Sequence, residues 1–403
     1  MKIGKQCSVS VDAAKSLNNI SMNNFEFQNP VKLIFGKGQI ARLPEEIAPE
    51  TRILLTYGGG SIMKNGVYTQ VKEALKDYDV LEFGGIEANP DYHTLIKAIA
   101  ICKEQNVDML LAVGGGSVID GTKFIAAGAC YDGDAWDIIG NPDLIRDALP
   151  LAAVLTLPAT GSEMNSGGVI SRRDRGEKFA FSSPQTFPLF SILDPTTIYS
   201  LPKRQIANGI VDTYAHTLEQ YLTTSISTLV MDRWAEGLLQ TLVEIGPKLI
   251  ENHEDYDLCA NFMLTATMAL NGFIAMGVDQ DWTTHMIGHE LTALHGLDHG
   301  VTLAIVYPGV MQVLRQAKQT KLLQYGERVW GITQGSIDER ISATIAATEQ
   351  FFRSLGMKTR LSEHGIGDET IATIVSRFRQ RGWKLGEARV TPDQVELILN
   401  AVK

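Results

Sequence analysis

The chain has 403 residues, enough for two domains with sizeable hydrophobic cores. Its formal net charge is −10 and it contains no dense run of lysine and arginine, which argues against nucleic acid or an anionic membrane as a partner. No apolar stretch is long enough to span a bilayer, so no membrane segment is expected. The cysteines are scattered and form no Cys-x-x-Cys pair, which indicates a reducing compartment and a metal site without thiolate ligands. They are Cys7, Cys102, Cys130 and Cys259.

Residues 1–21 differ in character from the rest of the chain. They are polar and lack the apolar core of a signal peptide, so we expect a loosely ordered leader without a functional role. A location in the cytoplasm follows from this expectation. The patterned part of the chain begins after the leader, at Met22.

Residues 22–200 alternate short apolar runs with helical patterns. Strands separated by helices are typical of a mainly parallel sheet covered by helices, so this part is predicted to be an α/β dinucleotide-binding domain. The predicted strands are Val31–Phe35, Arg52–Tyr57, Val80–Phe83, Met109–Val113 and Ala152–Leu157, and two of the predicted helices are Gly66–Lys76 and Pro90–Gln105.

The sequence Gly-Gly-Gly-Ser follows two of these strands, at residues 58–61 and 114–117. In the second case it leads into the helical pattern VIDGTKFIAAGA, which gives a strand, a glycine turn and a helix. Glycines allow a close approach of the backbone, and the first N–H groups of a helix attract an anion such as a pyrophosphate. The turns lack the Gly-x-Gly-x-x-Gly fingerprint, and one such turn alone is most often only a turn. Two of them, together with the metal-binding pattern described below, indicate a cofactor that carries phosphate.

From residue 201 to residue 403 the pattern is helical, with few β-branched runs and no convincing strand. An all-α domain that carries the metal and the catalytic residues is therefore predicted. The boundary lies near Asp194–Pro202, and no flexible linker marks it. Because parallel sheets bind ligands at the carboxyl ends of their strands, the cleft between the two domains is the expected functional site.

Half of the eight histidines lie in residues 281–300, DWTTHMIGHELTALHGLDHG. Upstream, Asp212 and His216 are four residues apart in an apolar helical pattern, so both side chains lie on one face of the helix. His285 and His289 repeat this spacing. The two segments thus offer a carboxylate and several imidazoles.

A lone histidine is most often a surface or hydrogen-bonded core residue, and a single Asp-x-x-x-His pair often braces a helix. The combination is different, because a carboxylate in an apolar helix is costly to bury without a partner, and a metal ion would be such a partner. One carboxylate with two or three imidazoles suits a catalytic divalent metal that keeps an open coordination position. Fe²⁺ or Zn²⁺ is expected, although the spacing does not separate them from Mn²⁺ or Ni²⁺. The predicted ligands are Asp212, His216, His285 and His299.

Together these motifs resemble the iron-containing alcohol dehydrogenases, and within them the NADPH-dependent aldehyde reductases and butanol dehydrogenases. The resemblance rests on GGGSVIDGTK, LTLPATGSEMNSGGVIS, the triplet LDP at residues 193–195, the helix of Asp212 and His216, and the segment 285–299. It covers Met22 to about Lys403. It implies a metal-dependent oxidoreductase that transfers hydride between NADP(H) and a short-chain aldehyde or primary alcohol, mainly in the direction of aldehyde reduction.

The first glycine turn bears on the choice of cofactor. An acidic residue near the end of the second strand bonds the ribose hydroxyl of NAD and repels the 2′-phosphate of NADP. No acidic residue follows Tyr57 until Glu73, whereas NAD-preferring members of the family usually have an aspartate near the position of Gly59. NADPH is therefore predicted, with Gly59, Gly60 and Ser61 around its 2′-phosphate. The alternative is a turn that accepts both cofactors.

Further cofactor contacts are implied mostly by the resemblance. Gly115, Gly116, Ser117 and Asp120 would hold the pyrophosphate and the nearby ribose, although Asp120 could instead cap or brace its own helix. Residues of the LTLPATGSE motif would line the adenine and nicotinamide sides, and Lys178 would lie at the nicotinamide ribose. The residues predicted from that motif are Thr156, Thr160 and Ser162.

Two roles are open for His289, which lies one helical turn after His285: a catalytic proton relay, or a brace for the metal ligands. His295 is expected to be structural or at the rim of the cleft. The substrate pocket is expected to include residues from both domains. The candidates are Trp136, Asn165, Met276 and Trp282.

Other functions of this architecture are kept as alternatives. A polyol or glycerol-type dehydrogenase is one, and the lyase that forms dehydroquinate is another, although the segment 285–299 has no lysine or arginine to bind its phosphate. A metal-dependent hydrolase is more distant, since it would need no dinucleotide. The sequence pattern does not reveal an interface; relatives include dimers and larger rings, and a homodimer is expected.

Overall fold

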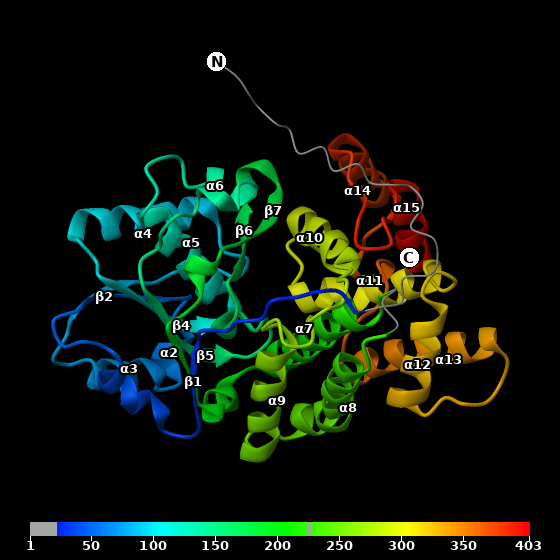
Figure 1. The fold of residues 1–403 in the computed structure, drawn as a ribbon, viewed down its shortest axis with the longest axis horizontal. Coiled ribbons are helices and arrows are strands. Elements are labelled where there is room, and N and C mark those ends of the chain that lie inside the picture. Colours follow the sequence, from blue (N-terminus) through cyan, green and yellow to red (C-terminus); the bar gives the residue numbers. More distant parts are fainter. Residues whose placement is uncertain (1–21, 224–226) are drawn as a thin grey trace.

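The structure is a computed structural model that describes residues 22–223 and 227–403. The predicted leader, residues 1–21, lies outside the described residues. Figure 1 shows an α/β half built around a sheet and a second half built from helices, and the first residues of α7 (Lys203–Tyr221) lead from one to the other. This arrangement confirms the predicted fold class.

The α/β half is organised by a six-stranded sheet in which all neighbouring strands are parallel. The strand order is β1-β8-β5-β4-β2-β3. β4 and β5 lie in the middle and their apolar side chains are buried on both faces, as expected of central strands in a parallel sheet. The strands are β1 (Lys32–Phe35), β2 (Arg52–Tyr57), β3 (Asp79–Phe83), β4 (Met109–Gly115), β5 (Leu151–Leu157) and β8 (Phe190–Leu193).

The five predicted strands are all present, with ends that differ by at most two residues. The sequence prediction did not include β8, nor the antiparallel hairpin of β6 (Gly167–Arg172) and β7 (Glu177–Ser182). Helices were predicted at 66–76 and 90–105, and they appear as α3 (Val67–Ala74) and α4 (Tyr92–Gln105).

Alternate residues of the central strands face two separate hydrophobic clusters. Leu110 and Ala112 of β4 face the cluster that includes α4 and α5 (Gly116–Ala129), whereas Leu111 and Val113 face the cluster that includes α3. The sheet is therefore covered by helices on both faces, which leaves the carboxyl ends of its strands as the open edge. The short helices of this half are α1 (Leu43–Glu46), α2 (Ser61–Lys64) and α6 (Asp137–Gly140).

The second half consists of α7, eight further α-helices and a short 3₁₀ turn at Ser362–His364 in the described residues. Its only strand-like pairing there is an isolated bridge between Leu385 and Val390. The helices after α7 are α8 (Leu229–Glu251), α9 (Tyr256–Ala269), α10 (Thr283–His295), α11 (His299–Val313), α12 (Gln319–Trp330), α13 (Ile337–Ser354), α14 (Asp368–Arg381) and α15 (Pro392–Ala401).

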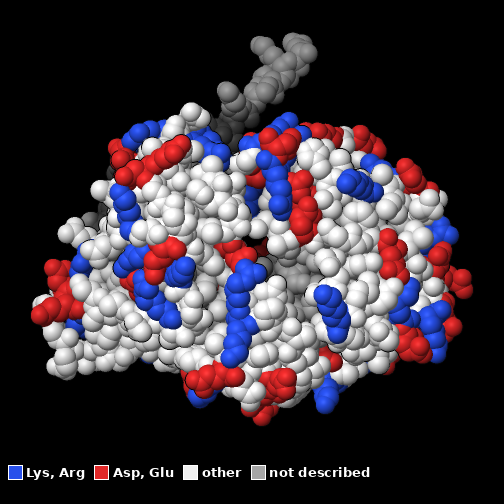
Figure 2. All heavy atoms as spheres, turned by 180° about the vertical axis from the view of Figure 1, so that it is seen from behind, with Lys and Arg blue, Asp and Glu red and all other residues white. Residues whose placement is uncertain are grey.

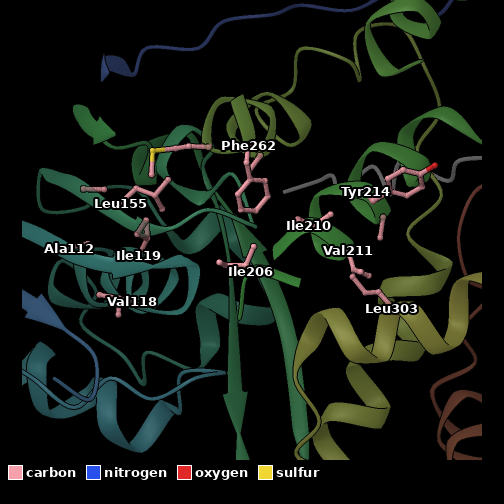
Figure 3. Close-up of a cluster of buried hydrophobic side chains, with 14 of the residues drawn as sticks. Ala112, Val118, Ile119, Leu155, Ile206, Ile210, Val211, Tyr214, Phe262 and Leu303 are labelled. Atoms are coloured by element: carbon pink, nitrogen blue, oxygen red, sulfur yellow. The ribbon is translucent and has the colours of Figure 1, made fainter. Parts of the chain in front are cut away.

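The two halves share one hydrophobic core. Leu155 of β5 belongs to the same buried cluster as Ile206 and Ile210 of α7 and Phe262 of α9, and Figure 3 shows these side chains between the sheet and the helices. Burial of apolar surface between the two halves stabilises the position of α7 relative to the ends of the strands. The division into residues 22–200 and 201–403 stays a prediction.

The charges on the surface agree with the absence of a dense basic run from the sequence. On the face that Figure 2 shows, acidic and basic side chains are interspersed and no broad patch of one sign is visible. Among residues 22–223 and 227–403, every helix falls short of the length and hydrophobicity needed to cross a bilayer.

Candidate active site and metal centre

A large cavity lies between the ends of the sheet strands and the helical half. Its volume is about 1320 Å³, and residues of both halves line it. Gly58 and Ser61 of the first glycine turn reach it, together with the whole second turn at 114–117. Gly59 and Gly60 do not line it. The cavity therefore lies at the position predicted for the functional cleft, between the two halves.

Four predicted metal ligands meet at this cavity. Asp212 and His216 lie one turn apart on α7, His285 lies near the start of α10, and His299 is the first residue of α11. One potential ligand atom from each lies within 4.8 Å of those of the others. From Asp212 Oδ1 the distances to the Nε2 atoms are 3.4 Å for His216, 3.9 Å for His285 and 3.6 Å for His299.

The hydrogen bonding of this group fits a bound cation. Asp212 Oδ1 and His285 Nε2 are buried and have no hydrogen-bond partner. Buried polar atoms without a partner cost free energy, and a divalent metal ion at their centre would remove that cost. One carboxylate and three imidazoles also match the ligand preference of Fe²⁺ and Zn²⁺. The residues present therefore fit such an ion.

The pKa shifts of these residues favour the protonation states that metal binding requires. Burial alone would raise the pKa of Asp212, but the neighbouring His216 and His285 lower it, so the carboxylate stays ionised. Burial lowers the pKa of His216 to about 4 and holds the pKa of His299 well below its usual value. Neutral imidazoles have a free lone pair, which a metal ligand requires.

Glu219 is a functional candidate that the sequence prediction missed. Its Oε1 atom lies 3.2 Å from Nδ1 of His285. The same oxygen accepts a hydrogen bond of 3.2 Å from the backbone N–H of His285. Burial alone would lower the pKa of His285, but Asp212 and Glu219 raise it. A carboxylate on the second ring nitrogen orients an imidazole and makes it a stronger metal ligand. The signal in the sequence is the position of Glu219 on α7, three residues after His216 and on the same helical face.

Replacing Glu219 with alanine should weaken metal binding by about 10- to 100-fold, because His285 loses the group that orients it. Competition with a chelator of known affinity measures this loss. Glu236→Ala is a matched control, since Glu236 is a buried glutamate that bonds Tyr221 instead of a metal ligand. Equal metal affinities in wild type and Glu219→Ala would contradict the role given to Glu219.

The second glycine turn packs too tightly for larger residues. A Cβ atom at Gly116 would lie 2.5 Å from the side chain of Thr160, and one at Gly115 would lie 2.9 Å from Leu157. Glycine is therefore required where β4 ends against β5. The first N–H groups of α5 start at this turn, beside the cavity, where they can bind an anion.

Asp120 of α5 and Ser162 of the β5–β6 connection form part of a buried polar network. Ser162 Oγ donates a hydrogen bond of 2.6 Å to Asp120 Oδ1, and the N–H of Val169 donates one of 2.9 Å to Oδ2. Lys123 Nζ donates a bond of 2.9 Å to Ser162 Oγ. The Asp120 carboxylate therefore holds the β5–β6 connection in place, rather than its own helix. Both residues line the cavity, and their direct contact with a cofactor stays a prediction.

Lys178 brings a cation to the same cavity from the β6–β7 hairpin. Its Nζ donates a hydrogen bond of 2.8 Å to Asn89 Oδ1. Burial lowers its pKa to about 8, against the opposing effect of Asp212 and Asp120. Thr156 and Thr160 line the cavity as well, so every residue predicted to bind the cofactor lies there except Gly59 and Gly60.

His289 lines the cavity beside the metal-ligand set without joining it. Its ring centroid lies 5.3 Å from that of His299. Burial, and then the charge of Lys178, holds its pKa well below the usual value, so it is a neutral imidazole. His295 is exposed and does not line the cavity, and its Nε2 atom lies 2.9 Å from Thr370 Oγ1, so its role stays a prediction.

Some of the residues predicted for the substrate pocket line the cavity and one does not. The residues of this set that line the cavity are Trp136, Asn165 and Trp282. Met276 is not among the lining residues, although it was predicted with them.

Two family models match the chain and together cover most of it. One describes the iron-containing alcohol dehydrogenases and matches residues 30–195, and the other describes the C-terminal part of the same family and matches residues 206–402. The chain therefore belongs to the iron-containing alcohol dehydrogenase family. This confirms the predicted family and the predicted enzyme class, an oxidoreductase of alcohol dehydrogenase type, and it excludes the hydrolase and lyase alternatives.

Several relatives align over almost the whole chain. The NADPH-dependent aldehyde reductase YqhD of Escherichia coli is 55% identical over 371 residues, which are 91% of this chain and 96% of the relative. The NADH-dependent butanol dehydrogenase A of Clostridium acetobutylicum is 40% identical and covers 95% of this chain and 99% of the relative. A crystal structure of E. coli YqhD superposes with a TM-score of 0.93 at 53% identity, covering 95% of this chain and 99% of that one.

Proposed function

We propose that the chain reduces short-chain aldehydes to primary alcohols with NADPH, with a divalent metal held by Asp212, His216, His285 and His299. The observation that carries the proposal is the convergence of these four side chains in a cavity that also receives both glycine turns. A relative that is 55% identical over 91% of this chain is named an NADPH-dependent aldehyde reductase, which supports the choice of substrate and cofactor. The iron-containing family supports Fe²⁺ as the metal.

Each set of residues has a distinct part in this reaction. When bound, the metal supplies Lewis-acid polarisation of the carbonyl oxygen and NADPH supplies the hydride. The second glycine turn and the start of α5 bind and align the cofactor phosphates at the ends of β4 and β5. Lys178 donates a hydrogen bond to Asn89 at the cavity and interacts electrostatically with Asp212. The indole of Trp282 packs against the ring of His285 at the cavity and so shields the metal ligands from water.

The preference for NADPH rests on the first glycine turn. No carboxylate is present at residues 58–61, and Ser61 lines the cavity where its hydroxyl and N–H can bind a phosphate. Gly60 has a φ of 96°, a left-handed conformation that favours glycine at this point of the turn. Space for the additional phosphate is therefore available without repulsion from a nearby acid.

Replacing His289 with alanine should lower kcat by about 100-fold while the metal content stays at the wild-type level, if His289 passes the proton to the product oxygen. The measurement combines steady-state kinetics with metal analysis of the same preparation. A loss of metal would instead assign His289 to bracing the ligand set. Wild-type kcat in the variant would contradict both roles.

We also propose a cellular location and an oligomeric state. Scattered cysteines and the absence of a helix that could cross a bilayer in the described residues agree with an enzyme of the cytoplasm. A homodimer is proposed from the expectation for relatives, and no nucleic-acid partner is proposed because the chain is acidic. Size-exclusion chromatography with light scattering measures the oligomeric state.

A substrate panel tests the proposed function. Purified protein is assayed by nicotinamide absorbance with NADPH or NADH and with propanal, butanal, glyceraldehyde or, in reverse, glycerol. We expect the largest kcat/KM with NADPH and butanal or propanal. A larger value with glycerol would indicate the polyol dehydrogenase alternative.

A further inference from the structure

Trp282 occupies an unusual backbone conformation beside the metal-ligand set. Its φ is 65°, in the left-handed region that bulky L residues rarely adopt. It directly precedes α10, the helix that carries His285 and His289. Strain of this kind persists only where the surroundings fix it, and it clusters at functional sites. The residues on both sides of Trp282 reveal what fixes it here.

The anchor on one side is Asp281, which is buried. Its backbone N–H donates a hydrogen bond of 2.9 Å to the carbonyl of Glu219, the residue that also orients His285. Its carboxylate accepts hydrogen bonds from the N–H and the hydroxyl of Thr283 on the other side of Trp282. The chain is thus held immediately before and after the tryptophan.

A buried ion pair secures this anchor. Lys318, at the end of the segment that leads to α12, pairs with the Asp281 carboxylate and also donates a hydrogen bond of 2.6 Å to the carbonyl of Leu222. Glu387 lies 3.4 Å from the same Nζ atom. Gly386 packs directly against Asp281 and Thr283, so that a Cβ atom at this position would collide with both. Three separate parts of the chain therefore set the position of Trp282.

The indole lies against the ligand set and lines the cavity. Its ring centroid is 5.0 Å from that of His285, with an angle of 75° between the planes, and 6.0 Å from that of His216. Its Nε1 donates a hydrogen bond of 2.9 Å to the side chain of Gln280, which lines the cavity too. Because Gln280 is exposed, the packing of the indole against the two imidazole rings restricts it more than this hydrogen bond does. It forms a fixed wall next to the atoms that would hold the metal.

We propose that Trp282 determines the substrate specificity of the enzyme: its indole limits the size of the group attached to the aldehyde carbon, and the buried Asp281–Lys318 pair keeps it in place. This inference rests on the proposed function, because the carbonyl must lie next to the four metal ligands. The group on the carbonyl carbon then lies beside the indole, which lines the cavity with its ring centroid 5.0 Å from that of His285. Linear aldehydes fit beside this wall, whereas a branch at C2 collides with it.

The decisive variant is Trp282→Gly. Glycine adopts a φ of 65° without strain, so the backbone of residues 281–283 keeps its path while the indole is removed. The probes are propanal, a linear aldehyde, and 2-ethylbutanal, which is branched at C2. We expect the ratio of kcat/KM for 2-ethylbutanal to that for propanal to rise by about 10- to 100-fold, as for other steric changes in apolar pockets.

Asp281→Asn tests the anchor without removing the indole. Asparagine keeps an oxygen that accepts the hydrogen bond from Thr283 but loses the charge that pairs with Lys318. The same ratio should rise by a smaller factor, with a higher KM for propanal and a smaller change in kcat. Trp234→Ala is the matched control, because Trp234 stacks on Phe273 and does not line the cavity. Its ratio should equal that of the wild type.

Metal content and NADPH binding by fluorescence are measured on every variant. An unchanged ratio in Trp282→Gly with its metal retained would overturn the assignment, and so would loss of the metal, which would make the indole a support for the ligands. A wild-type protein that reduces no aldehyde would refute the proposed function and this inference with it. Wild-type activity on propanal with an unchanged ratio in the variant would refute this inference alone.

Discussion

Replacing Asp212 with alanine should give a folded protein that retains no metal and whose kcat/KM for butanal is lower by about a thousandfold. Asp212 supplies the only carboxylate among the four converging side chains, and its Oδ1 atom is the point from which the other three ligands lie 3.4 to 3.9 Å away. Loss of a Lewis acid removes about 4 kcal/mol of transition-state stabilisation, which corresponds to that factor. Metal analysis and steady-state kinetics on the same sample measure both effects.

The control must separate loss of metal from general damage. Asp232 is a carboxylate that is equally buried in the helical half, where it pairs with Lys321 of α12. Asp232→Asn should lower the melting temperature because a buried ion pair is broken, yet it should keep its metal. NADPH binding should persist in Asp212→Ala, since the glycine turns belong to the other half. Full activity in Asp212→Ala would refute the assignment of this residue as a ligand.

Replacing Gly59 with aspartate should reverse the cofactor preference, with kcat/KM for NADPH reduced about 10- to 100-fold relative to that for NADH. A carboxylate about 4 Å from the 2′-phosphate is repelled by about 1 to 4 kcal/mol, depending on the local dielectric. The structure has room for the new side chain, because nothing lies within 4 Å of a Cβ atom at Gly59. Steady-state kinetics with both cofactors at saturating butanal give the ratio.

Gly59→Asn separates charge from size. Asparagine has nearly the same shape as aspartate but no charge, so its ratio should remain close to that of the wild type. If both variants change the ratio equally, crowding of the turn and not charge is responsible. If neither does, the 2′-phosphate lies elsewhere, away from Gly59, which does not itself line the cavity.

Much of the fold could be predicted because the apolar runs of the sheet are distinctive. The sequence MLLAV of β4 is buried on both faces and leads into a glycine turn, which leaves few alternatives to a central parallel strand. β8 was missed because its four residues, FSIL, are too short for periodicity to separate strand from helix. The β6–β7 hairpin was missed although Gly176, with a φ of 60°, occupies its turn. A hairpin signal depends on turn chemistry that the apolar pattern does not contain.

The candidate site was predictable as far as local spacing determines it. Asp212 and His216 meet because a helical turn separates them, whatever the rest of the chain does. The contact between Glu219 and His285 could not be derived in this way, since the two residues are 66 positions apart and only the packing of α10 on α7 brings them together. The position of Trp282 depends likewise on Lys318, which is distant in the sequence.

The most direct test of the central claim is NADPH oxidation by purified protein in the presence of butanal, before and after treatment with a chelator, followed by addition of Fe²⁺ or Zn²⁺ under nitrogen. We expect the chelator to abolish oxidation and the metal to restore it in proportion to the ions bound per chain. The same treatment should restore nothing in Asp212→Ala. Undiminished NADPH oxidation in protein shown to contain no metal would contradict a metal centre built from Asp212, His216, His285 and His299.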